Sequence, residues 1–218
     1  MRANRKELLL QVYDTLLAAL GPQNWWPAQT PFEVILGAIL AQNTAWSNAA
    51  AAIANLRRNG LLSLASVCGI NTPQLEALIR PSGFYRQKSG KILAFCRHLA
   101  TKWNGSLEEF LALEMERLRA ELLSIRGIGP ETADSIVLYA AFQPSFVVDT
   151  YTWRIFSRHG WVEESISYDD LREFFMEAMD PDVHLFQEFR ALLVRIGHLY
   201  CRKTPLCQQC PLCVFMDA

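Results

Sequence analysis

The residues best suited to chemistry begin at a short glycine turn. Gly127 and Gly129 flank Ile128, and glycine permits positive φ and the close approach of another backbone. Pro130 follows and suits the first turn of a helix, where its missing N–H costs no hydrogen bond. A helix start offers free amides and a positive dipole end, which together favour a phosphate. The turn therefore predicts an anion site, with a plain tight hairpin as the alternative.

Asp149 is the candidate catalytic side chain. A fixed carboxylate stabilises positive charge that develops at a reacting centre. It can also orient or activate the attacking water. Asp is equally a favoured helix N-cap, and Thr150 opens a new run of residues with helical spacing, so a capping role is the alternative. One residue can serve both purposes.

The C-terminal cysteines form a second candidate site. Four of the six cysteines crowd together as Cys201, Cys207, Cys210 and Cys213, with gaps of five, two and two residues. Such density is typical of a metal site rather than of disulfides. A [4Fe–4S] cluster and a tetrahedral zinc ion both accept four thiolates, and a metal-free loop is the third possibility.

Helices are expected to position all of these residues, because apolar side chains recur at helical spacing and no alternating run is long enough to demand a sheet. Turns rich in glycine, proline and asparagine separate them. We therefore expect an all-α protein. The expected helices cover residues 5–20, 31–41, 46–58, 73–80, 88–102, 107–111, 115–124, 131–142, 150–158, 168–179 and 184–198.

Composition and charge limit the class of protein and the partners that the sequence allows. With 218 residues, of which 51% are hydrophobic, the chain can bury a real core. No apolar run approaches the ~20 residues that cross a bilayer, so no membrane partner is expected. The net charge of −1 does not favour DNA, but residues 80–102 contain six basic residues and no acid. That stretch is either a solvated face or a phosphate track; its basic residues are Arg80, Arg86, Lys88, Lys91, Arg97 and Lys102.

Several segments resemble the endonuclease III superfamily of DNA glycosylases. The helix-hairpin-helix, Gly/Pro-rich loop and Asp of that family are matched by IRGIGPETADSIVLYA and VVDTYTWRIFSRHG, and two further segments by AILAQNTAWSNAAAAIANL and SGFYRQKSGKI. The resemblance covers residues 30–213. It implies two helical lobes, one of residues 30–142 that ends in the hairpin, and one of residues 1–29 plus 143–218 that carries the cysteine loop. The base pocket would lie between them.

The resemblance also assigns roles to individual residues. Asp149 becomes catalytic, and Gln42 becomes the wedge that fills the gap left by a flipped nucleotide, although an ordinary turn role would suit its neighbours Asn43 and Thr44. The four cysteines would hold a [4Fe–4S] cluster, with first and last gaps shorter than the six and five residues usual in the family. The residues implied to bind DNA are Gln42, Arg126, Gly127, Ile128, Gly129 and Thr132.

Glu131 departs from the strand-cleaving members of the family. Those members carry a Lys at this position, which attacks the sugar and forms a Schiff base. A carboxylate cannot do so, and we therefore expect water to be the nucleophile and lyase activity to be absent. Glu131 itself either lines the base pocket or only favours the first turn of a helix.

Three tryptophans are candidate pocket walls. Trp25, Trp26 and Trp46 lie in NWWPAQTPFE and AQNTAW, and aromatic rings hold flipped bases by stacking, with an added gain for cationic bases. Together with Glu131 they resemble the 3-methyladenine DNA glycosylase branch. The alternative is that they are core anchors, as most tryptophans are.

The sequence thus predicts a monomeric, cytoplasmic, nucleoid-associated DNA glycosylase without lyase activity. It would act on double-stranded DNA that contains a damaged base, remove alkylated purines such as 3-methyladenine and leave an abasic site. A mismatch-specific glycosylase for adenine, thymine or uracil, and a non-catalytic helix-hairpin-helix DNA-binding module, are the alternatives.

Overall fold

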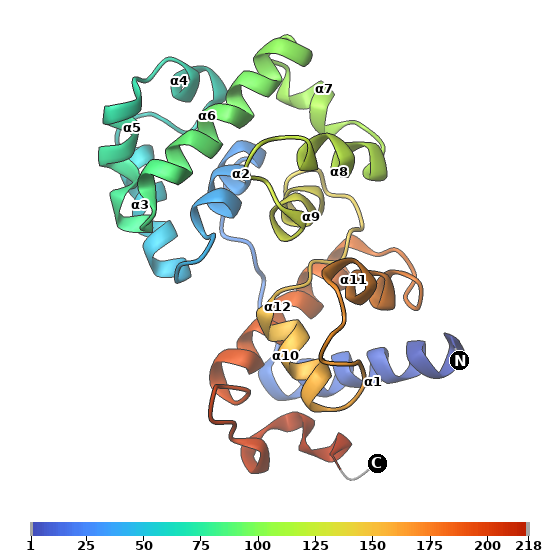
Figure 1. Cartoon of the computed structure of the whole chain (residues 1–218). Coiled ribbons are helices and arrows are strands. Elements are labelled where there is room, and N and C mark those ends of the chain that lie inside the picture. Colours follow the sequence, from blue (N-terminus) through green and yellow to red (C-terminus); the bar gives the residue numbers. More distant parts are fainter. Residues whose placement is uncertain (1, 217–218) are drawn as a thin grey trace. The chain divides into compact units, whose positions relative to one another are not determined.

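The structure is a computed structural model that describes residues 2–216. Over that range the chain forms twelve α-helices, three 3-10 helices and no strand (Figure 1), which confirms the expected all-α fold. The elements are α1 (Arg2–Leu20), α2 (Pro31–Leu40), α3 (Trp46–Arg58), α4 (Leu64–Cys68), α5 (Thr72–Ile79), η1 (Arg80–Ser82), α6 (Tyr85–Lys102), α7 (Leu107–Leu111), α8 (Met115–Leu123), α9 (Pro130–Tyr139), α10 (Thr150–Arg158), α11 (Tyr168–Met176), α12 (Val183–Leu199), η2 (Cys207–Gln209) and η3 (Pro211–Phe215).

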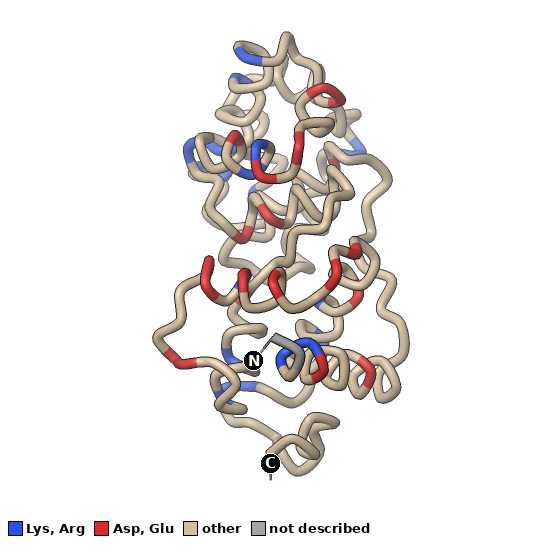
Figure 2. The backbone as a smooth tube through the Cα atoms, turned by 90° about the vertical axis from the view of Figure 1, so that its right-hand side faces the viewer, with Lys and Arg blue, Asp and Glu red and all other residues tan. Residues whose placement is uncertain are grey.

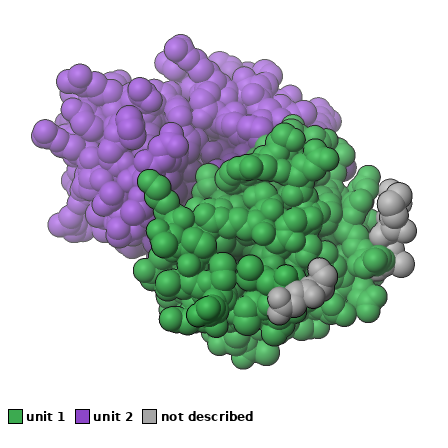
Figure 3. Space-filling model, turned by 60° about the horizontal axis from the view of Figure 1, so that its bottom comes forward, with its two compact units in different colours: residues 1–25, 144–218 green, residues 26–143 purple. Residues whose placement is uncertain are grey.

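The helices fall into two compact units, which are coloured separately in Figure 3. Unit 1 comprises residues 1–25 and 144–218, so it is built from both ends of the chain. Unit 2 comprises residues 26–143. None of the helices among residues 2–216 has the length and apolar character needed to cross a bilayer.

Unit 2 is organised around α2, whose residues from Phe32 to Leu40 are all buried. The Thr30 hydroxyl accepts a hydrogen bond from the Glu33 amide at 3.2 Å and caps the helix start. At Gly37, an added Cβ would lie 3.1 Å from the Trp26 ring, so glycine allows that ring to pack on the helix. The carboxyl end of α2 then leads directly to Gln42.

The expected helix-hairpin-helix is formed by α8 and α9. The Arg119 guanidinium donates to both carboxylate oxygens of Asp134, from Nε at 2.9 Å and from Nη2 at 3.2 Å. Asp134 is fully buried, and such a two-point pair fixes the relative position of two helices more tightly than a single contact does. The pair therefore fixes α8 relative to α9 on the two sides of the turn that joins them.

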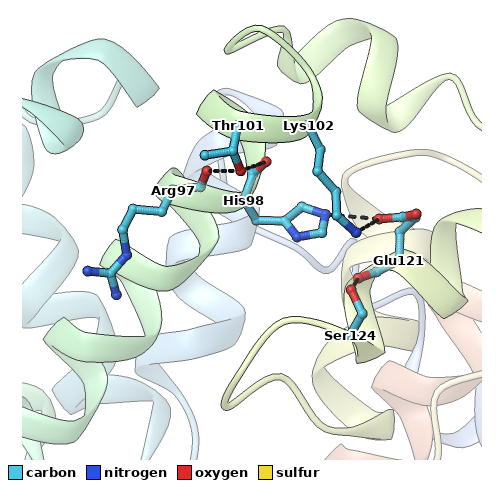
Figure 4. Close-up of polar contacts among 6 residues, drawn as sticks. All are labelled: Arg97, His98, Thr101, Lys102, Glu121 and Ser124. Atoms are coloured by element: carbon cyan, nitrogen blue, oxygen red, sulfur yellow. Dashed lines mark hydrogen bonds and ion pairs between the residues drawn. The ribbon is translucent and has the colours of Figure 1, made fainter.

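A second polar contact joins α6 to α8 (Figure 4). The Glu121 carboxylate lies 3.0 Å from Nε2 of His98 and 3.4 Å from Nζ of Lys102. Arg97 extends away from this carboxylate in the same view. The basic helix α6 is thus tied to the first helix of the hairpin by its carboxyl-terminal half.

Unit 1 has an aromatic core beneath α10, α11 and α12. The rings of Phe146 and Phe175 stack at 3.8 Å between centroids, and Phe186 and Phe189 meet Phe146 edge-on. A Cβ on Gly197 would lie 2.4 Å from the Tyr151 ring, so glycine permits the close approach of α10 to α12. This packing places the start of α10, and with it Asp149, against α12.

Several elements differ from those expected. Helices α1 and α6 begin three residues earlier and α11 ends three residues earlier, and the two other differences concern α4 and α9. Helix α4 was not anticipated, yet Ser63 and Ser66 form a reciprocal capping box that supports this five-residue helix. Helix α9 was expected to reach residue 142 but ends at Tyr139. The chain leaves the helix because Phe142 adopts a left-handed backbone with φ of 56°, and the Gln143 amide bonds back to the Val137 carbonyl.

Candidate DNA-binding and catalytic site

Asp149 caps α10 with one carboxylate oxygen. Its Oδ1 accepts hydrogen bonds from the amides of Tyr151 and Thr152, both at 2.9 Å, and from the Thr152 hydroxyl at 3.2 Å. The expected capping role is therefore confirmed. Oδ2 is buried and accepts no hydrogen bond from the described residues. The two oxygens thus have separate surroundings, and the second forms no hydrogen bond with the described residues.

Arg190 faces that second oxygen. Its Nε lies 3.5 Å from Oδ2 of Asp149, and both side chains are largely buried. Sequence analysis did not identify this residue, although a signal was available. Arg190 lies four residues after Phe186 and three before Leu193, both buried on α12, and a charge at a core-facing position indicates a buried partner.

A Tyr–His contact supports the same helix start. The Tyr151 hydroxyl lies 2.9 Å from Nε2 of His198 on α12. Burial, followed by the charge of Asp149, raises the pKa of Tyr151, so this hydroxyl keeps its proton at neutral pH. The contact joins α10 to α12 one residue beyond Thr150.

The glycine turn exposes backbone amides. Gly127 has φ of 92°, a conformation that strongly favours glycine. No described carbonyl accepts the amides of Gly127 or Gly129, whereas the Ile128 amide donates to Ile125 at 3.0 Å. The Ile128 side chain is 5% exposed and belongs to the core of unit 2. The geometry can accommodate an anion through the glycine amides, with Ile128 anchoring the turn.

Gln42 is brought to the same turn. Its Nε2 donates to the Thr132 hydroxyl at 2.9 Å and to the Gly127 carbonyl at 3.3 Å. Its Oε1 accepts a hydrogen bond from Nζ of Lys91. The predicted wedge residue and the predicted phosphate site are therefore neighbours in unit 2.

Arg126 and Glu131 lie on either side of the turn and are exposed. Glu131 is in the first turn of α9, where a carboxylate interacts favourably with the helix dipole. Its backbone carbonyl accepts the Ser135 hydroxyl at 2.7 Å. The helical role expected for this residue is thus present.

The three tryptophans divide between the units. Trp26 and Trp46 meet edge-on in unit 2 with centroids 5.0 Å apart, and Tyr139 lies 5.1 Å from Trp26. The rings of Trp26 and Trp46 pack against the core of unit 2, and Tyr139 is buried. Trp25 belongs to unit 1. Tyr139, which sequence analysis did not identify, completes a cluster of three aromatic rings.

Lys88 corrects one part of the expected phosphate track. It is 2% exposed, and its Nζ donates to the carbonyls of Leu40 at 2.8 Å and Ser82 at 2.7 Å. A buried side chain of this kind cannot bind a phosphate. Instead it fixes the end of α2, two residues before Gln42.

Both signs of charge are distributed over each unit (Figure 2).

Lys88 also predicts a pH dependence of stability. Burial, followed by the nearby charge of Lys91, lowers the pKa of Lys88 from 10.5 to about 8. Between these values the unfolded chain binds the proton and the folded chain has released it, so the free energy of unfolding rises with pH. At ~1.4 kcal/mol per pH unit, the Lys88 contribution grows by up to about 3 kcal/mol. Denaturant unfolding of wild type and Lys88→Met at pH 7.5 and 10 checks this, and parallel behaviour of the two proteins would contradict it.

The four clustered cysteines surround one cavity in unit 1. The cavity has a volume of about 270 Å³, and Cys201, Cys207, Cys210 and Cys213 all line it. All four are free thiols. Burial, with a further contribution from the other three thiols, raises the pKa of Cys210. Four thiols that line one cavity are a donor set that both a [4Fe–4S] cluster and a tetrahedral zinc ion accept. Among the described residues, no group of three or more His, Cys, Asp and Glu side chains is arranged closely enough to hold a metal ion.

Basic and aromatic groups complete the cavity wall. The Arg158 guanidinium donates to Sγ of Cys201 at 3.4 Å and to the Arg202 carbonyl at 2.6 Å. His159 also lines the cavity, and its buried Nδ1 has no hydrogen-bond partner among the described residues. A buried polar atom without a partner is costly, so the wall has hydrogen-bonding capacity that a bound group can use.

Comparison with known proteins agrees with this architecture. Residues 36–181 match the family described as HhH-GPD superfamily base excision DNA repair protein. The MJ1434 protein of Methanocaldococcus jannaschii, which carries the name of a DNA repair glycosylase, is 42% identical over 214 residues, or 97% of each chain. Endonuclease III of Thermotoga maritima is 30% identical, with 83% of this chain and 79% of the relative covered.

Solved structures show the same fold. The 3-methyladenine DNA glycosylase of H. pylori bound to 1,N6-ethenoadenine has a TM-score of 0.76 at 27% identity, covering 89% of this chain and 97% of that one. A trapped endonuclease III–DNA covalent intermediate has a TM-score of 0.81 at 20% identity, covering 96% and 94%. The chain belongs to the HhH-GPD superfamily of base excision DNA repair proteins.

Proposed function

We propose that this DNA glycosylase hydrolyses the N-glycosidic bond of alkylated purines such as 3-methyladenine in double-stranded DNA and leaves the strand intact. The single observation that carries the proposal is that the two carboxylate oxygens of Asp149 have different surroundings. Oδ1 is occupied by the helix cap, and Oδ2 is buried, forms no hydrogen bond with the described residues and lies 3.5 Å from Nε of Arg190.

The chemistry follows from that carboxylate. The bond between C1′ and the base nitrogen breaks, its electron pair leaves with the base, and positive charge develops on the sugar. Oδ2 of Asp149 stabilises this charge in a site of low dielectric constant, and the oxygen accepts a proton from the water that attacks C1′. The products are a free base and an abasic site. A cationic 3-methyladenine leaves as a neutral base and needs no added proton.

Glu131 supports hydrolysis rather than strand cleavage. A lyase needs an amine that forms a Schiff base with the sugar, and this position in α9 carries a carboxylate. The cluster of Trp26, Trp46 and Tyr139 supports a substrate with an electron-poor ring, because aromatic faces favour cationic bases. The relative from H. pylori, named as a 3-methyladenine DNA glycosylase, supports the same substrate class.

The proposed cofactor is a [4Fe–4S] cluster. Cys201, Cys207, Cys210 and Cys213 would hold it in the cavity that they line. When bound, it would supply structural cross-linking between the end of α12 and the C-terminal segment. The exposed loop between Cys201 and Cys207 contains Arg202 and Lys203, which suit DNA phosphates.

A substrate panel tests the proposal. Purified protein is offered duplexes that contain 3-methyladenine, 7-methylguanine, thymine glycol, uracil opposite guanine, or adenine opposite 8-oxoguanine. We expect release of methylated purines, with strand breaks that appear only after alkali, because hydrolysis leaves an abasic site in an intact strand.

Borohydride provides the complementary measurement, because it traps Schiff bases. We expect no covalent protein–DNA adduct, while a bifunctional glycosylase run in parallel gives one. Breaks before alkali, or a trapped adduct, would overturn the assignment based on Glu131. Release of uracil or mismatched adenine alone would replace the proposed substrate, and DNA binding without any base release would indicate a non-catalytic module.

A further inference from the structure

Both ends of the Gln42 side-chain amide form hydrogen bonds. One end donates to Thr132 at 2.9 Å and to the Gly127 carbonyl at 3.3 Å, and the other end accepts from Lys91. These partners lie on the hairpin and on α6, 85, 90 and 49 residues away in the sequence. A side chain held by three hydrogen bonds cannot enter a duplex without breaking them.

Lys91 lies across the glycine turn. A Cβ placed on Gly127 would be 2.5 Å from Cγ of Lys91 and 2.9 Å from its Cδ, so the lysine stem occupies the space that the absent side chain leaves. The ammonium group is therefore delivered to the turn whose Gly127 and Gly129 amides have no described backbone acceptor. An anion bound at those amides would lie within the electrostatic reach of Lys91.

The backbone that leads from α2 to Gln42 is fixed by a separate contact. Lys88, one helical turn before Lys91 on α6, holds the Leu40 carbonyl with its buried Nζ. Lys88 thus fixes the backbone that leads to Gln42, while Lys91 contacts the Gln42 side chain. The backbone stays in place if the side chain is released.

We propose that Lys91 couples phosphate binding at the hairpin to the release of Gln42. In the free protein the Lys91 ammonium holds the Gln42 amide against the hairpin. A DNA phosphate at the glycine turn is a stronger partner for an ammonium than a neutral amide oxygen, so it draws Lys91 away and frees Gln42. Lys91 is a positioning residue, and the inference rests on the proposed roles of the hairpin and of Gln42 in DNA binding.

A double-mutant cycle tests the coupling without requiring base release. The ligand is a duplex with a tetrahydrofuran abasic analogue, and its dissociation constant is measured for wild type, Lys91→Met, Gln42→Ala and the double variant. In the Gln42→Ala background, Lys91→Met removes only a phosphate contact. In the wild-type background it also removes the bond that restrains Gln42, so the loss of affinity is expected to be about fivefold smaller.

Arg97→Met is the matched control, because Arg97 is an exposed basic residue of α6 and is not one of the hydrogen-bond partners of Gln42. It should weaken binding by the same factor in both backgrounds. Lys91→Arg should restore most of the affinity, and circular dichroism checks that each variant is folded. Equal losses for Lys91→Met in both backgrounds, or no loss in either, would overturn the coupling. Absence of base release with the coupling intact would overturn only the proposed catalytic function.

Discussion

Replacement of Asp149 by Asn is expected to reduce base release by about a hundred- to a thousandfold, the usual effect of removing one preorganised electrostatic group. Asn caps a helix as well as Asp does, so the hydrogen bonds from Tyr151 and Thr152 to Oδ1 are retained. What disappears is the negative charge at Oδ2. Single-turnover release of 3-methyladenine from a duplex is the measurement.

The free energy of unfolding and a control substitution at a second N-cap distinguish a loss of catalysis from a loss of folding. Asp149→Asn should lower the free energy of unfolding by roughly 3 kcal/mol, because the largely buried Arg190 loses its ion pair. Asp182→Asn makes the same chemical change at the exposed N-cap of α12, where Oδ1 accepts from the Leu185 amide at 3.0 Å, and should leave base release unchanged. Full activity in Asp149→Asn would remove the basis of the proposed mechanism. Equal losses in the two variants would indicate a folding effect.

Local patterns in the sequence predicted the helices and the hairpin because their causes are local. Apolar spacing, the glycine turn and the capping preference of Asp149 all act within a few residues, and the structure confirms a cap at Asp149 and a hairpin between α8 and α9. The missed helix α4 has a local cause too. Its capping box uses Ser66 in place of the usual Glu or Gln, so the pattern was harder to recognise.

The contacts that organise the candidate site are long-range and were not predictable from spacing. Lys91 meets Gln42 across 49 residues, and Asp149 faces Arg190 on another helix. Lys88 and Lys91 are alike in sequence, yet one is buried against the Leu40 carbonyl and the other reaches the hairpin. Which face of α6 is covered depends on how α2 and α5 pack against it, and no local pattern contains that information.

The cysteine cavity carries the second large expected effect. Protein reconstituted with iron and sulfide under anaerobic conditions is expected to bind about four iron ions per chain, as a [4Fe–4S] cluster requires. Cys210 is the most buried of the four proposed ligands, at 9% exposure. Its replacement by Ser should abolish stable iron binding and lower the melting temperature, because the cluster would link η2 and η3 to the end of α12.

Cys68→Ser is the matched control, because Cys68 is an exposed free thiol in unit 2, outside the cavity. It should bind as much iron as wild type and melt at the same temperature. One zinc ion per chain and no iron would replace the cluster with a tetrahedral site, and the shortened gaps between the cysteines would then have a direct explanation. The cavity of about 270 Å³ is lined by other side chains as well as by the four cysteines, so the metal content, and not the volume, decides between the cluster and zinc.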